Sequence, residues 1–410
     1  MDITVATIEI KNTSFKLLIG YLYDNKINVL YNRTYPLRVS NKDGDIFDLT
    51  SLSEDLKQIK VIEDPKKRLK VTINDLVLIL PPFGLNVFSD TKTTNTIAQN
   101  GMIDKIDIAN ALSMVKKVRI EEPNDEIVDI IPNVFGVDGN RTFKEPPLGY
   151  ISSSLLVKAH IFTLPSKLVK NFKKAVLDAG FSIKRTVIAP LGVNSLLELN
   201  KAVGDKYVLV DYNKDNTVIS FFGNGKLYAS KYFDVGGEDI TKDIANSFEI
   251  SMDKAEEIKC IYGLDLRETE FNAPILSVLG DDGLPRKHNV KELNKIVNES
   301  LDKWNTFFSN CLSTLLAEYG DLKNTIPLVF IGNGTLLNGF KDYVKKYYTS
   351  NKITFYTNDS IGALEPGDIN MLGAIAFSSI YKGSLEDEAK IDIASVNRKQ
   401  KEYHEEDDEL

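Results

Sequence analysis

The stretch from residue 207 to residue 263 constrains the fold more than any other part of this chain. It begins with an apolar strand that ends in an acid, Tyr207–Asp211, and a polar turn joins this strand to a second one, Thr217–Phe222. A glycine-rich hairpin then leads to a third strand, which is expected to reach Thr241. This arrangement places a carboxylate and turn amides beside a bound phosphate. The pattern therefore predicts a sheet that holds a ligand at its first turn.

The N-terminal residues repeat this order of elements. Strands are predicted at Ile3–Ile10, Phe15–Gly20 and Lys26–Tyr31, joined by tight turns. Each series of strands leads towards a helix, so the chain is predicted to contain two similar βββα halves. Later, an apolar strand from Ile326 runs into the turn Gly332-Asn333-Gly334 and a helix N-terminus, whose free amides suit an anion or a polar ligand.

Composition narrows the class of protein. The chain has 410 residues, a formal net charge of -8 and 43% hydrophobic residues, which fits a folded protein of two or more domains and argues against a nucleic-acid-binding surface. It has 2 cysteines and 3 histidines, too few and too scattered for a metal cluster. No apolar run approaches the ~18 residues of a membrane-spanning helix. With no signal-like N-terminus, a cytoplasmic protein is expected.

The segments around these strands carry their own predictions. Residues 49–62 have helical periodicity, and residues 71–80 read as one strand closed by prolines. Between 85 and 163 the composition changes, and an inserted subdomain is expected there. Its expected parts are a Thr/Asn-rich linker at 91–100, a helix at 105–119 and strands near 125–137. Helices are further expected within 162–180, 190–200 and 367–381.

Several separated motifs resemble one protein family. The strongest is Val235-Gly-Gly-Glu-Asp-Ile-Thr-Lys-Asp-Ile-Ala245, followed by Ala255-Glu-Glu-Ile-Lys-Cys-Ile-Tyr-Gly263. Others are Ile131–Gly139 with Pro146–Gly149, and Gly332–Leu337. In this order they resemble the bacterial cell-division protein FtsA, over most of residues 1 to 382. The resemblance implies an α/β fold of the actin/Hsp70-like ATPase type, with two duplicated βββα domains and an FtsA-type 1C subdomain insertion.

The resemblance also implies subdomain limits. They are subdomain 1A at 1–84 and 164–200, subdomain 1C at 85–163, subdomain 2A at 201–235 and 305–364, subdomain 2B at 236–304, and a helix returning to 1A at 365–382. The remaining residues, 383–410, are polar and end in acids, so a disordered acidic tail is expected. FtsA proteins usually end in a basic amphipathic helix that binds lipid. This tail lacks that pattern, so membrane association is expected only through a partner.

The phosphate-binding loops depart from the family pattern. The family's first loop reads Asp-Ile-Gly-Thr-Thr-Lys, whereas this chain has Glu9-Ile-Lys-Asn-Thr-Ser14. The second reads Asp-Ile-Gly-Gly-Gly-Thr-Thr-Asp, whereas this chain has Asp211-Tyr-Asn-Lys-Asp-Asn-Thr-Val218. Side chains in place of glycine obstruct backbone approach to a phosphate, and Asp215 adds negative charge there. Lys11 is a candidate for a displaced positive charge. Weak or absent ATP hydrolysis is therefore predicted.

The nucleoside-binding features are retained, and they complete the predicted site for ATP or ADP and Mg²⁺. The predicted nucleotide-binding residues are Thr13, Asp211, Asn216, Thr217, Gly236, Gly237, Glu256, Lys259, Gly332, Asn333 and Gly334. Candidate magnesium ligands are Asp211, through water, and Glu9. Alternatives stay open: Glu256 and Lys259 also fit a solvated ion pair, Asp211 a cap of its own turn, and Gly332–Gly334 a tight strand-to-helix turn. No catalytic residue is identified.

The function that the resemblance implies is an FtsA-like cell-division protein that assembles into filaments or a division scaffold. Its partner would be the tubulin-like protein FtsZ, docking on subdomain 2B near the helix Lys291–Asp302, at the inner face of the membrane. The family's basic position near Ser300 is not basic here. Two alternatives remain: an active ATPase with altered loops, and a scaffold like the pilus-assembly protein PilM, which shares the fold.

Overall fold

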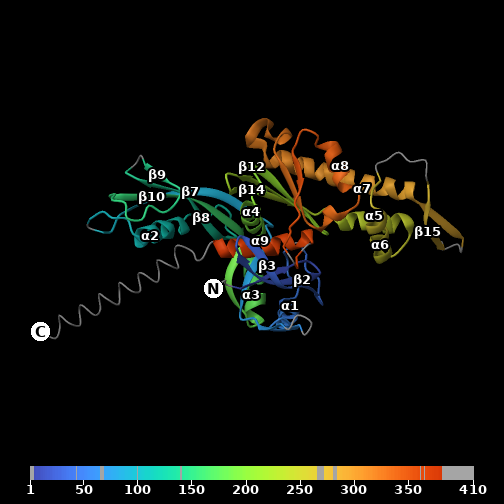
Figure 1. Cartoon of the computed structure of the whole chain (residues 1–410), viewed down its shortest axis with the longest axis horizontal. Coiled ribbons are helices and arrows are strands. Elements are labelled where there is room, and N and C mark those ends of the chain that lie inside the picture. Colours follow the sequence, from blue (N-terminus) through green and yellow to red (C-terminus); the bar gives the residue numbers. More distant parts are fainter. Residues whose placement is uncertain are drawn as a thin grey trace. The chain divides into compact units, whose positions relative to one another are not determined.

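The computed structural model describes residues 4–42, 44–64, 69–98, 100–138, 141–265, 272–279, 284–360, 362–363 and 365–380. The chain divides into two compact units (Figure 1). Of the described residues, those within 4–84 and 171–377 form unit 1, and those within 85–170 and 378–380 belong to unit 2. The predicted acidic tail lies outside the described residues.

The first sheet of unit 1 has the order β3-β2-β1-β6-β11. Its strands are β1 (Val5–Ile10), β2 (Ser14–Tyr23), β3 (Lys26–Pro36), β6 (Asp75–Leu80) and β11 (Ser182–Ile188). The first three run antiparallel, and β6 and β11 are parallel to β1. Asp24 and Asn25 have φ values of 48° and 57°, as a two-residue hairpin requires, and this turn fixes the register of β2 against β3.

The second sheet of unit 1 repeats this order as β14-β13-β12-β17-β18. Its strands are β12 (Lys206–Tyr212), β13 (Thr217–Gly223), β14 (Lys226–Phe233), β17 (Leu328–Ile331) and β18 (Ile353–Phe355). Strands β12 to β14 are antiparallel, and β17 and β18 are parallel to β12. The predicted duplication into two βββα halves is therefore confirmed, with β1 and β12 as equivalent central strands.

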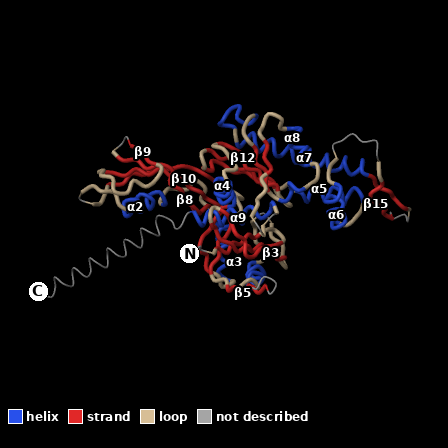
Figure 2. Tube along the Cα trace, in the orientation of Figure 1, coloured by secondary structure: helices blue, strands red, loops and turns tan. Residues whose placement is uncertain are grey.

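Two helices each end one half of unit 1 but contact a strand of the other half. Helix α4 (Ala189–Leu199) ends the first half, yet Asn194 accepts a hydrogen bond of 2.7 Å from the hydroxyl of Tyr207 in β12. Helix α9 (Ile369–Ile380) ends the second half, yet the sulfur of Met371 accepts a hydrogen bond from the hydroxyl of Thr7 in β1. The two helices lie side by side (Figure 2) because glycines let their backbones touch. A Cβ on Gly373 would lie 2.5 Å from the carbonyl carbon of Gly192.

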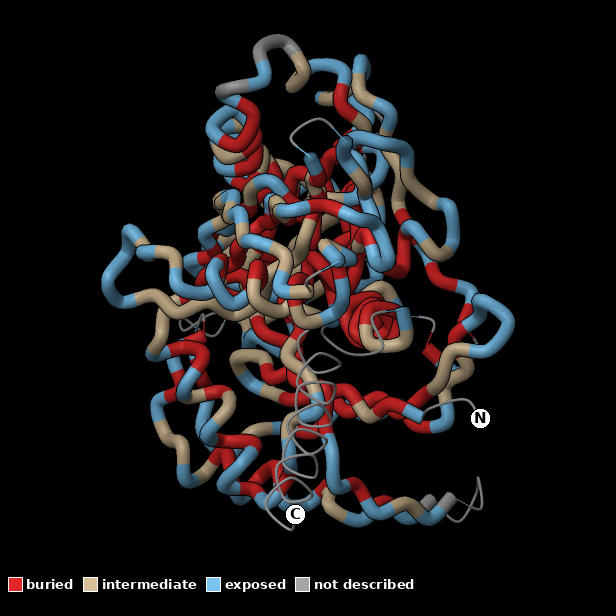
Figure 3. Tube along the Cα trace, turned by 90° about the vertical axis from the view of Figure 1, so that its left-hand side faces the viewer, coloured by how far each residue is buried: buried red, intermediate tan, exposed pale blue. Residues whose placement is uncertain are grey.

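Further helices of the second half cover the second sheet and extend from it. They are α5 (Gly237–Phe248), α6 (Met252–Tyr262), α7 (Val290–Leu315), a 3-10 helix (Ala317–Asn324) and α8 (Phe340–Tyr347), with a hairpin of β15 (Pro274–Leu279) and β16 (Pro285–Asn289). Trp304 is 1% exposed and stacks on Phe308 inside this core. Buried residues lie mainly inside the trace, and exposed residues lie mainly on its outer loops (Figure 3).

Unit 2 is a four-stranded antiparallel sheet in the order β7-β10-β8-β9 with one helix against it. The strands are β7 (Asn86–Asn95), β8 (Asp125–Val137), β9 (Arg141–Phe143) and β10 (Ser154–Pro165), and the helix is α2 (Lys105–Lys116). Asp104 and Asp107 form a capping box at the start of α2. The buried Asp107 also accepts the amide of Ile97, which fixes the loop before the helix. Helix α3 (Ser166–Asp178) follows β10.

Four local predictions were wrong. The first half of the expected linker at 91–100 is the end of strand β7, because its alternating threonines suit a half-buried strand paired with β10. The predicted helix 49–62 is α1 (Leu49–Lys57), after which β4 (Val61–Asp64) begins and pairs with β5 (Leu69–Thr72). The predicted strand 71–80 breaks between β5 and β6. The third strand of the second half ends at Phe233, because Gly236 caps helix α5.

The crossing of α4 and α9 yields a stability prediction. Replacing Gly373 with alanine should lower the free energy of unfolding by about 1–3 kcal/mol, despite alanine's better helix propensity, because its Cβ has no room against Gly192. Urea unfolding followed by circular dichroism measures this change. Gly204→Ala is the matched control, since a Cβ there would meet nothing within 4 Å. Equal midpoints for the two variants would contradict close packing at the crossing.

Candidate functional site

A cavity of about 250 Å³ lies in unit 1 where the equivalent first turns of the two sheets meet the start of α9. Its walls are the β1–β2 turn, the β12–β13 turn and the segment before α9. The charged residues that line it are Glu9, Lys11, Lys16, Asp211, Lys214, Asp215 and Glu365. Because acids and lysines alternate around it, the cavity has no strong excess of either charge. It is smaller than most small-molecule sites, which are about 300–1,000 Å³.

Asn370, at the start of α9, joins the two halves at the floor of the cavity. Its amide nitrogen donates to Glu9 Oε1 at 2.9 Å and to Asp211 Oδ2 at 3.3 Å. Glu9 and Asp211 occupy equivalent ends of β1 and β12, and both are buried. One amide group therefore holds two interior carboxylates together, and facing two acceptors fixes the orientation of the amide.

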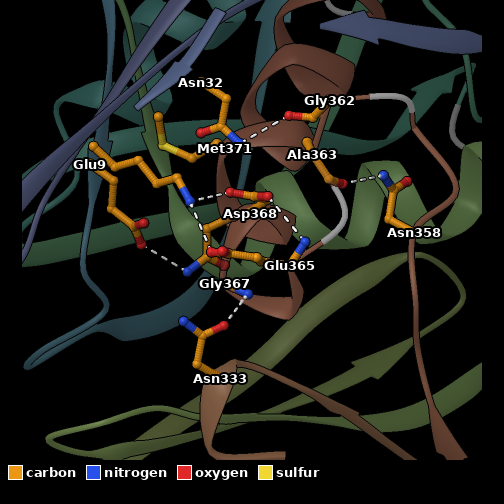
Figure 4. A network of polar contacts seen from close by, with 12 residues as sticks. Glu9, Asn32, Asn333, Asn358, Gly362, Ala363, Glu365, Gly367, Asp368 and Met371 are labelled. Atoms are coloured by element: carbon orange, nitrogen blue, oxygen red, sulfur yellow. Dashed lines mark hydrogen bonds and ion pairs between the residues drawn. The ribbon is translucent and has the colours of Figure 1, made fainter. Parts of the chain in front are cut away.

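Ion pairs continue the junction, and Figure 4 shows Glu9, Glu365 and Asp368 close together. Lys11 Nζ lies 3.3 Å from Glu9 Oε2. Lys16 in β2 forms an ion pair with Asp368, which is 1% exposed, and lies 3.6 Å from Glu365. All of these contacts cross from one half to the other except that between Lys11 and Glu9.

Burial and charge shift the pKa of two groups in this junction. Burial raises the pKa of Asp211 above its usual range, and Lys11 and hydrogen bonds from Asn213 and Asn370 offset only part of this rise. Burial by itself would lower the pKa of Lys11, yet Glu9, Asp211 and Asp215 raise it above its ordinary value. Lys11 is therefore a firmly charged ammonium group held among acids.

The junction does not suit a divalent cation. Magnesium takes oxygen ligands in near-octahedral geometry and keeps several waters. Here the carboxylates of Glu9 and Asp211 already accept the N–H groups of Asn370, and the Lys11 ammonium pairs with Glu9. Across the described residues, no group of three or more His, Cys, Asp or Glu is arranged to hold a metal. The candidate metal ligands thus face positive and N–H groups of their own chain.

The second predicted phosphate loop is the turn between β12 and β13. This turn forms hydrogen bonds with the start of helix α5, whose N–H groups could otherwise bind an anion. The amides of Gly237 and Glu238 donate to the carbonyl oxygens of Asn213 and Lys214, at 3.0 and 2.8 Å. The amide of Gly236 donates to Asp239 at 2.9 Å. The first N–H groups of α5 therefore have partners within the chain. A Cβ on Gly236 would collide with the carbonyl of Lys214, so this glycine is needed for the turn itself.

Glu256 and Lys259, the predicted nucleoside clamp, form an ion pair in which Lys259 is buried and Glu256 is about half exposed. Lys259 Nζ lies 2.6 Å from Glu256, and it donates to Gly237 O at 2.9 Å and to Thr241 at 2.8 Å. Burial by itself would raise the pKa of Glu256, but hydrogen bonds from Lys259 and Thr241 lower it. The pair ties α6 to the start of α5, and neither residue lines the cavity.

The other predicted residues divide into two groups. Asp211, Asn216 and Asn333 line the cavity, whereas Thr13, Thr217, Gly236, Gly237, Gly332 and Gly334 do not. The buried hydroxyl of Thr217 donates to Val235 O and accepts the Trp304 indole N–H at 2.9 Å, so this side chain belongs to the core. Gly332, with φ of 89°, and Gly334 both pack against Tyr212. These contacts are those of a tight strand-to-helix turn, and neither glycine lines the cavity.

Sequence reasoning missed the residues that join the halves. Lys16 reads as one polar position within a strand, and Asn370 reads as one within a small-residue helix. Asn333, predicted as a nucleotide contact, lines the cavity, and its side chain accepts the amide of Gly367 at 2.7 Å. A buried lysine in β2 facing the acid that caps the turn before α9 carries no local signature. Only the duplicated topology brings these residues together.

Comparison with known proteins identifies the family. A model described as cell division protein FtsA matches residues 208–371, and one described as an SHS2 domain inserted in FtsA matches residues 85–163. This chain is an FtsA-like protein. Cell division protein FtsA of Staphylococcus epidermidis is 24% identical over 385 residues, covering 93% of this chain and 80% of that protein. The Enterococcus hirae protein is 24% identical over 377 residues, covering 91% and 82%.

Solved structures confirm the predicted fold class of this FtsA-like chain. A chain of the PilM–PilN type IV pilus biogenesis complex has a TM-score of 0.61 at 14% identity, covering 93% of this chain and 99% of that one. MreB5 of Spiroplasma citri bound to ADP has a TM-score of 0.51 at 12% identity, covering 94% and 98%. These likenesses establish the actin-like ATPase fold alone. Among the described residues, no helix is long and apolar enough to cross a membrane.

The raised pKa of Asp211 yields a pH prediction. A carboxyl whose pKa is raised by folding binds its proton more tightly in the native state, so ionisation destabilises that state as pH rises above the unfolded value of 3.8. Asp211→Asn keeps the shape and removes this cost. The stability of the variant relative to the unchanged protein should therefore increase between pH 4 and pH 7.5, measured by urea unfolding at each pH.

Asp48 supplies a control of opposite sign. It caps helix α1, and hydrogen bonds from Ser51 lower its pKa. Asp48→Asn should therefore be the less stable protein above pH 4, and its deficit should shrink as the pH falls below 3.8, because protonation removes the favoured ionised cap. A pH-independent difference for Asp211→Asn would show that its charge carries no cost in the fold.

Proposed function

We propose that this FtsA-like protein is a division scaffold whose cleft hydrolyses ATP weakly or not at all. The observation that carries the proposal is the closure of the second phosphate turn onto α5, in which the carbonyls of Asn213 and Lys214 take the amides of Gly237 and Glu238. Oriented amides are the main means by which such turns stabilise a phosphate. An anion entering here would first have to displace hydrogen bonds within the chain.

The charges of the cleft support the same proposal over an active ATPase. Phosphoryl transfer depends on positioned positive charge around the transferred group. Lys11 and Lys16 are paired with Glu9 and with Asp368 and Glu365, so neither supplies an uncommitted charge. Asp215 adds a further negative charge to the wall. A role like that of PilM gains no support beyond the fold, because the likeness to the pilus complex is structural.

For FtsZ we propose a docking surface on subdomain 2B, residues 236–304, centred on the solvent face of α7. Lys291, Lys295 and Glu299 are exposed at spacings of four, as on one face of a helix. Ser300 is 3% exposed and faces the core, so it takes no part in this surface. The lysines offer positive charge to an acidic peptide tail, although Lys295 lies 3.9 Å from Glu299.

Self-association and position in the cell complete the proposal. We propose that copies of the chain assemble into filaments or a scaffold, and that the protein works at the inner face of the membrane at the division site. The FtsA and SHS2 family matches support this role. Recruitment would occur through FtsZ or another partner.

Nucleotide titration tests the proposed loss of ATPase function. A ligand at about 100 times its dissociation constant should stabilise by roughly 2.7 kcal/mol, which raises the thermal midpoint visibly. We expect no rise with millimolar ATP or ADP in the presence of Mg²⁺, and no change in this response for Asp211→Ala. A clear ATP-dependent rise that Asp211→Ala abolishes would overturn the proposal in favour of a working nucleotide site.

Charge reversal on α7 tests the partner surface. Lys295→Glu should weaken binding of a fluorescent FtsZ C-terminal peptide about tenfold, measured by anisotropy at low salt, because it replaces attraction with repulsion. Lys345→Glu, an exposed position on α8, is the matched control and should bind as the unchanged protein does. Equal affinity for both variants would place the docking site elsewhere.

A further inference from the structure

The cavity contains a lysine where a metal-dependent site would leave room for a cation. Glu9 and Lys11 are two residues apart at the end of β1, so their side chains leave the chain on the same side. Lys11 Nζ reaches Glu9 Oε2, and this oxygen has no hydrogen-bond donor of its own. Asp211 and Asp215, from the opposite half, also act electrostatically on Lys11. The ammonium group therefore faces acids from both halves.

We propose that Lys11 is a tethered cation that takes the place of a divalent metal ion between Glu9 and Asp211. The inference concerns the metal alone, and it deepens the proposed scaffold function by explaining how the two buried carboxylates are balanced without a bound cation.

Charge balance supports this replacement. Two carboxylates brought together from separate halves repel each other unless a positive group lies near them. Lys11 supplies one positive charge, and the N–H groups of Asn370 supply the remaining hydrogen bonds to both acids. Lys16 with Asp368 adds a second, buried link between the halves. The chain thus provides, from its own side chains, the contacts that a bound ion would make.

The backbone of Lys11 is fixed by hydrogen bonds, which keeps its side chain close to the two acids. Its amide donates to Ser14 O at 2.8 Å, which closes the β1–β2 turn, and its carbonyl accepts the side chain of Asn41. About a third of its side chain, 36%, remains exposed, so removing the charge leaves a space that water and an ion can enter. The backbone of the turn does not depend on the side chain.

The test removes the lysine charge and asks whether metal restores stability. In nucleotide-free protein, Lys11→Met and Lys11→Gln should both lower the thermal midpoint. MnCl2 at 10 mM should then raise the midpoint of these variants by about 3 °C or more, while the unchanged protein responds to neither MnCl2 nor MgCl2. The paramagnetic resonance signal of free Mn²⁺ should fall with the variants and not with the unchanged protein, which reports binding directly.

Two controls separate a specific site from general screening. Lys214→Met removes a lysine at the rim of the same cavity, whose partner at 3.3 Å is Glu238, and it should gain no Mn²⁺ response. The double variant Glu9→Gln with Lys11→Met removes both charges, so it should need no metal and bind none. This variant also keeps the test informative if a single substitution prevents folding.

Each remaining outcome overturns the inference. Stabilisation of the unchanged protein by Mn²⁺ or Mg²⁺ would mean that a metal binds beside Lys11. Lys11 variants that lose stability and bind no Mn²⁺ would mean that the lysine is only a structural partner of Glu9. Because these experiments contain no nucleotide, their failure is distinguishable from failure of the proposed scaffold function, which depends on the response to ATP.

Discussion

Two acids buried at equivalent ends of two duplicated sheets set the main electrostatic problem of this structure. Glu9 and Asp211 lie at the ends of β1 and β12, where the halves meet, and a buried charge without a partner is costly. Asn370 donates to both, and it can do so only because α9 crosses from the second half onto the first. That crossing depends on the contact between Gly192 and Gly373. The backbone approach of two helices thus positions the amide that satisfies both carboxylates.

The glycines that remain near the cleft have a structural explanation. Gly236 lies under the carbonyl of Lys214, and Gly332 and Gly334 pack against Tyr212. These positions support the β12–β13 turn whether or not a ligand binds there. The glycines that are missing are those within the turns, where a phosphate would approach. The fold of the family is therefore compatible with a cleft that is closed by its own chain. The glycines that support the turns are retained for packing, whereas those that would let a phosphate approach are absent.

Much of the fold was predictable from local patterns, because hairpin turns and strand alternation are encoded in neighbouring residues. The two series of strands and the hairpin at Asn224-Gly225 appear where expected, with Asn224 and Gly225 both at positive φ. Strand β7 was missed because its threonines resemble a linker until pairing with β10 gives them a partner. In the site, Asp211 was singled out as the acid that ends its strand, and Glu9 from the comparison of the first loop with the family pattern. Lys16, Asp368 and Asn370 were not, since segments more than 300 residues apart meet only after folding.

The central claim is that side chains of this protein occupy the place of metal and phosphate in the cleft. A high-resolution crystal structure grown with millimolar ATP and MgCl2 tests it most directly. The account predicts Lys11 Nζ against Glu9, Asn370 between Glu9 and Asp211, and the amides of Gly237 and Glu238 on the carbonyls of Asn213 and Lys214. A magnesium ion between the two carboxylates, with phosphate oxygens on those amides, would contradict it.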